Sequence, residues 1–391
     1  MHARKVTWEA SLAPIPLAPI EEGERAMRIC NACRYCEGFC AVFPAMERRL
    51  NFSEADLHFL ANLCHDCREC FYSCQYAPPH PFALNLPQAL ASIRQQTYRT
   101  YAWPGMLRGL FQRSALSVGI AVAAAPLAFL VVVMGYAPPT VLFSANGSTE
   151  GSFYRVLPYA AMTGLFGFVA VLVAGALVAG LIGFWRDLGE SLRSAANPKA
   201  LGRAVVESLS LRYLDGGGPG CAYPHDVSSQ ARRWLHHLTF YGFLLCFAST
   251  ISAAVYHHFL GREAPYPALS VPVLLGTLGG FGLLIGPAGL LWLKRIRAPE
   301  PSEPIQTRMD SAFLILLLLT SFTGFLLLAF RNSAAMGTLL AIHLGVVAGL
   351  FLTLPYGKFV HAIYRFAALV RNALEDERAK RGSPSTPEDV S

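Results

Sequence analysis

Six long apolar stretches constrain the fold of this chain more than any other feature. Each could cross the hydrocarbon core of a bilayer, which is about 30 Å thick. They lie near residues 114–136, 157–184, 235–258, 269–292, 311–330 and 335–356. Within a bilayer the backbone must satisfy its own hydrogen bonds, so the six stretches predict six transmembrane helices and an all-α fold.

Basic residues in the loops predict the orientation of these helices. The loops at 186–234 and 293–310 are rich in Lys and Arg, whereas the loops of the opposite side hold Arg155, Arg262 and Arg331. Because Lys- and Arg-rich loops remain in the cytoplasm, we expect a multi-pass protein of the bacterial inner membrane with both termini in the cytoplasm. We attribute the net charge of +7 to the basic residues that flank the helices in the lipid bilayer, and we expect no nucleic-acid partner.

Eight of the ten cysteines form two copies of the spacing Cys-x2-Cys-x2-Cys-x3-Cys. This spacing is typical of two 4Fe–4S clusters in which the fourth cysteine of each run ligates the other cluster. The first cluster is therefore expected on Cys30, Cys33, Cys36 and Cys74. The second is expected on Cys64, Cys67, Cys70 and Cys40.

The surroundings of the cysteines favour a helical ferredoxin-like domain over residues 23–80. Ser53 and Asp56 form a variant capping box that predicts a helix between the two runs. Ala41 and Gln75 stand where the usual pattern has proline, which is not a ligand. Zinc is the alternative metal for such cysteines, but a zinc ion needs only four ligands. Each of the two runs has three closely spaced cysteines and a fourth cysteine after them, and this pattern fits cubane clusters better than zinc.

Six of the eleven histidines lie at the third and sixth apolar stretches: His236, His237, His257, His258, His343 and His361. Haem b needs two axial imidazoles from facing helices. His343 and His361 are 18 residues apart, which is five whole helical turns, so we expect them on one helix face about 27 Å apart. We expect one haem b at the inner level, between His361 and either His236 or His237.

A second haem would lie at the outer level, between His343 and either His257 or His258. His343 lies well inside its apolar stretch, whereas His257 and His258 lie at the rim of theirs. At a rise of 1.5 Å per residue, this is a difference in membrane depth of about 10 Å. Interfacial histidines at helix ends are the alternative for His257 and His258.

A glycine-rich loop at 211–224 precedes the third stretch. Its residues of interest are Gly216, Gly217, Gly218, Gly220 and Cys221. No strand precedes the loop and no Gly-Lys-Ser/Thr closes it, so it is not a nucleotide-binding fingerprint. The glycines would let the backbone approach the ferredoxin-like domain, the haem edge or a partner protein, and a flexible linker is the alternative.

The remaining segments complete the expected organisation. Residues 1–22 form an N-terminal extension and residues 81–113 a linker to the membrane. Residues 114–358 form the six-span haem b domain. Residues 359–374 are expected to form an amphipathic helix on the membrane surface, followed by a disordered tail to residue 391.

Two resemblances follow from these motifs. The segment from His343 to His361 resembles the haem-bearing last helix of the nitrate reductase gamma subunit, which implies bis-histidine haem b and quinol contact. The motifs Cys30–Cys40, Leu214–Gly218 and Trp234–Phe243 together resemble the tricarballylate-utilisation protein B, or CitB, family over nearly the whole chain.

The second resemblance implies a membrane protein with iron–sulfur clusters and haem. It would reoxidise the FAD of a cytoplasmic partner, the tricarballylate dehydrogenase, and pass electrons to the quinone pool. On this reading the chain holds no catalytic residues for the substrate. The alternatives are a quinol-fed reductase, an electron-transfer module for another flavoprotein reaction such as cobalamin ring contraction, and a membrane redox sensor.

Overall fold

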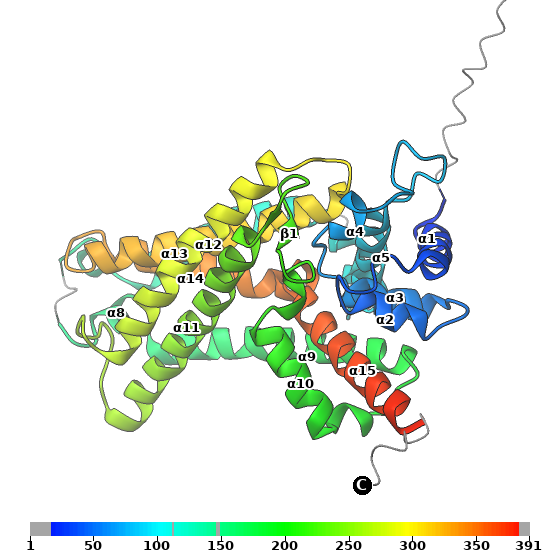
Figure 1. Ribbon diagram of the computed structural model, residues 1–391. Coiled ribbons are helices and arrows are strands. Elements are labelled where there is room, and N and C mark those ends of the chain that lie inside the picture. Colours follow the sequence, from blue (N-terminus) through cyan, green and yellow to red (C-terminus); the bar gives the residue numbers. More distant parts are fainter. Residues whose placement is uncertain (1–16, 112, 146–148, 383–391) are drawn as a thin grey trace, which may run out of the picture.

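Helices dominate the computed structural model, which describes residues 17–111, 113–145 and 149–382 (Figure 1). In this described part the only sheet is a two-stranded antiparallel ribbon of β1 (Cys221–Ala222) and β2 (Ser228–Ser229). The expected all-α class is confirmed. Most of the expected N-terminal extension lies outside the described residues.

The two cysteine runs belong to a domain of short helices over residues 17–100, here called the cysteine domain. Its helices are α1 (Pro19–Cys33), α2 (Val42–Glu47), α3 (Glu54–Leu63), α4 (Glu69–Tyr72) and α5 (Leu86–Thr100). The expected helix between the runs is α3. It begins with the capping box, in which the Asp56 N–H donates to Ser53 Oγ at 3.2 Å and the Ser53 N–H donates to Asp56 Oδ2 at 3.2 Å.

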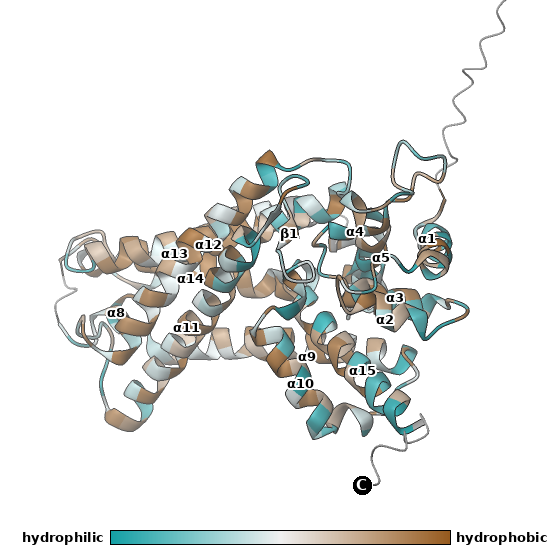
Figure 2. Ribbon diagram, viewed as in Figure 1, coloured by the Kyte–Doolittle hydropathy of each residue, from teal (hydrophilic) through white to brown (hydrophobic). Residues whose placement is uncertain are grey.

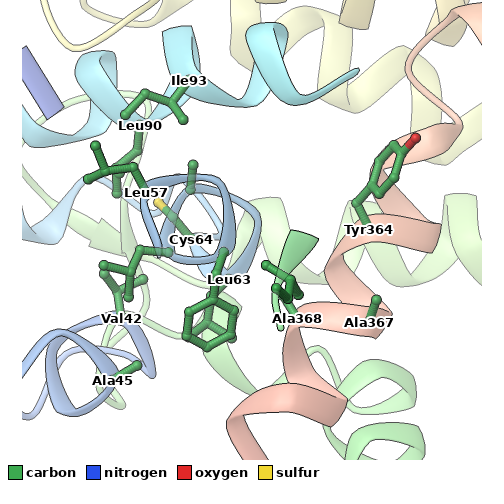
Figure 3. Close-up of a cluster of buried hydrophobic side chains, with 14 of the residues drawn as sticks. Val42, Ala45, Leu57, Leu63, Cys64, Leu90, Ile93, Tyr364, Ala367 and Ala368 are labelled. Carbon is green, nitrogen blue, oxygen red and sulfur yellow. The ribbon is translucent and has the colours of Figure 1, made fainter. Parts of the chain in front are cut away.

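The cysteine domain extends beyond residue 80, where we expected a linker to begin. Helix α5 packs on α1 and α3 and buries Leu90 and Ile93 (Figure 3). The approach of α1 is close, because a Cβ built on Gly23 would lie 2.3 Å from Ile93 Cδ1. Residues 86–100 are therefore part of the domain core, and the connection to the long helices begins after Thr100.

Among the described residues, six helices are long and apolar enough to cross a membrane, which confirms the number expected. They are α6 (Ser114–Tyr136), α9 (Tyr159–Asp187), α11 (Ala231–Leu260), α12 (Val271–Ile296), α13 (Pro304–Phe330) and α14 (Met336–Thr353). Figure 2 shows hydrophobic residues, in brown, along much of their length, and hydrophilic residues, in teal, more often in the cysteine domain.

Small residues bring α11 and α12 into close contact. A Cβ built on Gly242 of α11 would lie 2.8 Å from the Gly279 carbonyl oxygen of α12. Such pairs let helix backbones approach in the absence of a hydrophobic driving force. Helix α12 also packs on α13, α13 on α14, and α14 on α6.

Shorter elements connect these helices. They are η1 (Gly105–Phe111), α7 (Pro139–Leu142), α8 (Ser152–Val156), η2 (Ser194–Ala196), α10 (Pro198–Leu209), η3 (Arg212–Leu214) and η4 (Leu354–Tyr356). The last of these corrects one expectation. His343 and His361 do not share a continuous helix, because α14 ends at Thr353 and a new helix, α15 (Val360–Gly382), begins six residues after Leu354. Pro355 cannot supply the N–H that a continuing helix needs.

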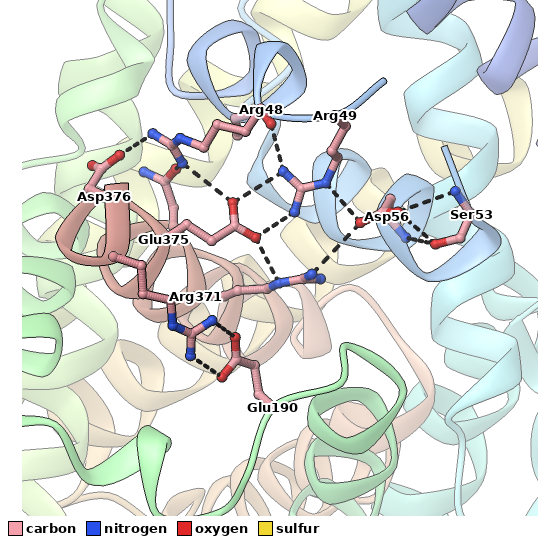
Figure 4. A network of polar contacts seen from close by, with 11 residues as sticks. Arg48, Arg49, Ser53, Asp56, Glu190, Arg371, Glu375 and Asp376 are labelled. Carbon is pink, nitrogen blue, oxygen red and sulfur yellow. Dashed lines mark hydrogen bonds and ion pairs between the residues drawn. The ribbon is translucent and has the colours of Figure 1, made fainter. Parts of the chain in front are cut away.

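Helix α15 differs from the expected surface helix in length and in surroundings. It runs to Gly382, eight residues beyond the expected end, so residues 375–382 are helical. It packs on α3, α9 and α10 and buries Ala368 and Leu369 completely (Figure 3). Its apolar face covers protein rather than lipid, while its polar face forms ion pairs (Figure 4). Residues 383–391 of the expected tail lie outside the described residues.

Candidate redox centres

The first cysteine set surrounds a cavity of about 350 Å³. Cys30 and Cys33 lie at the end of α1, which Arg34 terminates in the left-handed conformation, and Cys36 follows in the next turn. Cys74, from the second run, lines the same cavity. The structure thus brings Cys74 to the first run, as the crossed assignment requires, and the ligand assignment itself stays a prediction.

The second cysteine set lies deeper in the protein. Cys64, Cys67 and Cys70 line a smaller hollow together with Cys40 of the first run. Cys64 and Cys67 are buried, and Cys70 also reaches the edge of the first cavity. The two sets are therefore neighbours, with the second on the side of the domain that faces the long helices.

Electrostatics show what the thiols need in order to become ligands. Burial and neighbouring thiolates raise the pKa of Cys30, of Cys36 and of Cys40 to about 12. Thiolates at such sites need a compensating positive charge, and a bound metal supplies it. All ten cysteines are free of disulfides, so the sulfurs are available.

The all-sulfur donor set fits iron–sulfur clusters. In the described residues no group of three His, Cys, Asp or Glu side chains converges on one point as ligands of a single ion would. A cubane presents four separate iron corners, so its four cysteines stand further apart. Backbone N–H groups also point at the sulfurs: Asp66 N lies 3.3 Å from Cys64 Sγ, and Tyr76 N lies 3.4 Å from Cys74 Sγ. Such hydrogen bonds tune cluster potentials.

Two of the candidate haem ligands face each other. The rings of His236, in the second turn of α11, and His361, at the start of α15, have centroids 6.3 Å apart and are inclined by 73°. Two metal–nitrogen bonds of about 2 Å plus the half-widths of both rings add up to roughly the same separation. The pair therefore fits bis-histidine coordination of one iron.

Hydrogen bonding prepares both rings for this role. His361 Nδ1 donates to the Lys358 carbonyl oxygen at 2.6 Å, which leaves Nε2 without a proton and free to ligate. Burial, together with the positive charges of Lys358 and Arg365, holds the pKa of His361 well below its usual range, so the ring is neutral. His236 Nδ1 is buried and has no hydrogen-bond partner in the described residues.

His237, the other inner candidate, points elsewhere. Its ring stacks on Tyr241 at 5.7 Å between centroids and lies 5.9 Å from the Trp234 ring. Of the two inner candidates, His236 is the one that faces His361, and its role as a ligand stays a prediction.

The outer candidates do not come together. His258 Nε2 forms a hydrogen bond of 2.7 Å with the Tyr159 hydroxyl, and the His257 ring stacks on Tyr159 at 3.6 Å. His343 instead forms a hydrogen bond of 3.0 Å with Thr323 Oγ1 of α13. In the part of the chain that the structure describes, the contacts of His343 and those of His257 and His258 thus involve different residues, and the outer pairing stays a prediction.

The glycine-rich loop lies against the cysteine domain, one of the partners considered from sequence. A Cβ on Gly216 would lie 2.7 Å from Glu69 Cγ, and one on Gly217 would lie 3.0 Å from the Gly38 carbonyl oxygen. Gly217, with a φ of +88°, also adopts a backbone conformation that side chains disfavour. Cys221 is completely buried, in a cluster of side chains that includes Cys67.

Sequence reasoning missed two arginines that join the inner histidines to the second cysteine set. Arg232 lies one turn before His236, and its guanidinium donates to the carbonyl oxygens of His65, at 3.3 Å, and Asp66. Arg365 lies one turn after His361 and donates to the Cys64 carbonyl oxygen at 2.7 Å. The spacing of four residues between each arginine and its histidine is visible in the sequence.

Fold and site together define a multi-pass membrane protein with an N-terminal ferredoxin-like cysteine domain. The chain belongs to the CitB family. The family model for citrate utilization protein B matches residues 109–383, and the model for the citrate utilization protein B Fer4-like domain matches residues 23–100.

Comparison with a relative agrees with this assignment. The chain is 49% identical over 370 residues to citrate utilization protein B of Escherichia coli, a match that covers 94% of this chain and 96% of the relative. No solved structure matches the chain. The Fer4-like match ends at residue 100, where α5 also ends.

Proposed function

We propose that this protein is the membrane electron-transfer subunit of a flavoprotein–quinone oxidoreductase. The observation that carries the proposal is the His236–His361 pair, 6.3 Å between ring centroids. Its two helices also hold the segment that contains Cys64, through Arg232 and Arg365. A redox centre at the cysteines and another at the histidines would therefore be held as neighbours by the same side chains.

The proposed ligands are those the geometry brings together. Cys30, Cys33, Cys36 and Cys74 hold one 4Fe–4S cluster, and Cys64, Cys67, Cys70 and Cys40 hold the other. His236 and His361 hold one haem b. When bound, these groups supply one-electron carriers between a two-electron donor and a two-electron acceptor.

The exposure of the two cysteine sets supports an order for these carriers. The first set opens at the surface of the cysteine domain beside the exposed ring of Tyr35, where a protein partner can approach. The second set is buried on the side of the arginines, so it is the one nearer to His236 and His361. Electrons from a partner would enter at the first set and leave toward the membrane.

The family points to the donor and the acceptor. The relative is named for citrate utilization, so we propose a cytoplasmic FAD dehydrogenase that oxidises a tricarboxylate such as tricarballylate as the partner. The quinone pool of the inner membrane would accept the electrons. The Lys- and Arg-rich loops support a cytoplasmic position of the cysteine domain and of both termini.

Reconstitution tests the proposal directly. The purified protein in liposomes with a quinone should reduce that quinone only when both the partner dehydrogenase and its tricarboxylate are supplied. The preparation should also contain iron, acid-labile sulfide and b-type haem.

Two results would contradict this function. Turnover of a substrate in the absence of any flavoprotein would favour the alternative of a reductase in its own right. Zinc without acid-labile sulfide would remove the iron–sulfur clusters on which electron entry depends.

A further inference from the structure

Four arginines from four different elements converge on the second cysteine set. Arg68 belongs to the second run, and Arg94, Arg232 and Arg365 come from α5, α11 and α15. Arg68 and Arg94 are each only 1% exposed. Burying a guanidinium is costly unless a negative group compensates it, so this convergence requires an explanation.

Their hydrogen bonds show where the positive charge is directed. Arg94 Nη1 donates to the Ala61 carbonyl oxygen at 2.9 Å and to that of Cys64 at 3.2 Å, and Arg365 Nη2 donates to the same Cys64 oxygen at 2.7 Å. The guanidinium groups of Arg68 and Arg232 lie 4.8 and 4.9 Å from the Tyr223 ring centroid. These contacts involve neutral carbonyls and an aromatic ring, so they leave the arginine charges uncompensated.

The carboxylates near these arginines are fewer than the arginines. Asp66 lies among them: its carbonyl oxygen accepts a hydrogen bond from Arg232, and its carboxylate Oδ1 is buried without a hydrogen-bond partner in the described residues. Glu69 accepts a hydrogen bond from Ser228. Arg68 Nε and Arg94 Nη2 are buried without a hydrogen-bond partner in the described residues. Unpaired buried donors beside the cysteines mark a place for an anion.

The first cysteine set has different surroundings. Apart from the cysteines, the described residues that line its cavity are neutral, and Tyr35, Tyr72 and Gln75 are among them. The two sets thus resemble each other in sequence but differ in electrostatic environment. A cysteine-ligated cubane is an anion and becomes more negative on reduction, so nearby positive charge stabilises the reduced form.

We propose that Arg68, Arg94, Arg232 and Arg365 form a cationic shell that raises the reduction potential of the centre held by Cys64, Cys67, Cys70 and Cys40 above that of the other cysteine centre. This inference rests on the proposed function, because it assumes that both sets hold 4Fe–4S clusters. The four arginines act as positioning and tuning residues. Arg94, Arg232 and Arg365 contact the backbone that carries or precedes the ligands. Arg68 lies within the second run itself, and its guanidinium donates to the Ala298 carbonyl oxygen at 3.2 Å and to Ser302 Oγ at 2.7 Å.

The step that this shell favours is a simple one-electron transfer. One electron leaves the centre at Cys30, which is oxidised, and reaches the centre at Cys64, which is reduced, and no bond or proton is exchanged. Burial by itself would act in the opposite direction, because it disfavours the more negative reduced form. The relative order of the two potentials therefore shows which effect is larger.

A redox titration of the full-length holoprotein, followed by electron paramagnetic resonance, tests the proposal. The wild type should show two 4Fe–4S signals with different midpoint potentials. In Arg365→Gln the higher midpoint potential should fall by about 59 mV. For a one-electron couple this is a change of about tenfold in the equilibrium constant for electron transfer between the two centres. The lower potential should not move. Arg94→Gln repeats the test from a helix without a proposed haem ligand.

Two further variants separate charge from other effects. Arg365→Lys keeps the charge and should keep the higher potential close to that of the wild type. Arg262→Gln removes the same charge just beyond the opposite end of α11 and should change neither potential.

The proposal is overturned if the lower potential moves, if neither moves, or if Arg365→Lys shifts the potential as much as Arg365→Gln. A preparation without two 4Fe–4S signals would refute the proposed function as well, whereas two signals that do not respond would refute this inference alone.

Discussion

Glu375 of α15 is the residue whose replacement best tests how the cysteine domain is fixed to the helix that begins with His361. Its carboxylate forms ion pairs with Arg49 and, at 3.4 Å, with Arg48, both of the cysteine domain, and with Arg371 at 3.0 Å (Figure 4). The side chains of Glu375, Arg49 and Arg371 are only 13, 10 and 11% exposed. We consider the replacement Glu375→Gln, which keeps the shape and removes the charge.

The magnitude follows from this burial. Removing one partner of a fully buried ion pair costs about 3–5 kcal/mol, whereas an exposed pair contributes at most about 1 kcal/mol. Asp56 still neutralises part of the remaining charge, because it lies 2.8 Å from Arg49 and 3.7 Å from Arg371. We therefore expect Glu375→Gln to weaken the docking of α15 by about 2–3 kcal/mol, which is roughly 30- to 150-fold in the opening equilibrium.

Hydrogen exchange measured by mass spectrometry provides the assay. Amides of α15 and α2 should exchange faster in Glu375→Gln by that factor, because local opening governs their protection. The matched control is Glu24→Gln, which removes an exposed i,i+4 pair with Arg28 and should change protection by less than about threefold. Equal protection of α15 in the wild type and in Glu375→Gln would refute the reasoning.

Three further predictions concern the proposed ligands and the pH dependence. His361→Ala should remove the b-type absorption band, whereas His237→Ala should leave the haem-to-protein ratio unchanged; retention of the haem in His361→Ala would rule out this ligand. Cys40→Ser should damage the cluster held mainly by the second run, and damage confined to the other cluster, read from iron–sulfur spectra, would overturn the crossed assignment. Although burial opposes it, the hydroxyl and guanidinium groups around Asp56 lower its pKa. Its contribution to stability is therefore fully present above the unfolded pKa of about 3.9 and is lost as the pH falls through the lower folded value. Hydrogen exchange of α3 should accelerate only under such acidic conditions, and a loss of protection above about pH 6 would contradict this assignment.

The amino-acid sequence by itself determined the features that depend on local pattern. Long apolar runs specify membrane helices because the bilayer leaves the backbone no other way to form its hydrogen bonds, and all six were found. The Ser53–Asp56 capping box specified the start of α3 through contacts within a single turn. The CitB resemblance could also be seen from short motifs, since each is contiguous in the chain.

The tertiary structure decided everything that depends on which surface a helix faces. Helix α15 has the composition of a membrane-surface helix, yet its apolar face is buried by α3, α9 and α10. His236 and His237 are neighbours in the chain. Which of the two rings meets His361 depends on how the start of α15 lies against the N-terminal turns of α11. The same packing brings Arg232 and Arg365 to one short segment from helices more than a hundred residues apart. Local sequence cannot encode such contacts, because they arise from the mutual burial of distant surfaces, and here that burial places the inner histidines beside the second cysteine set.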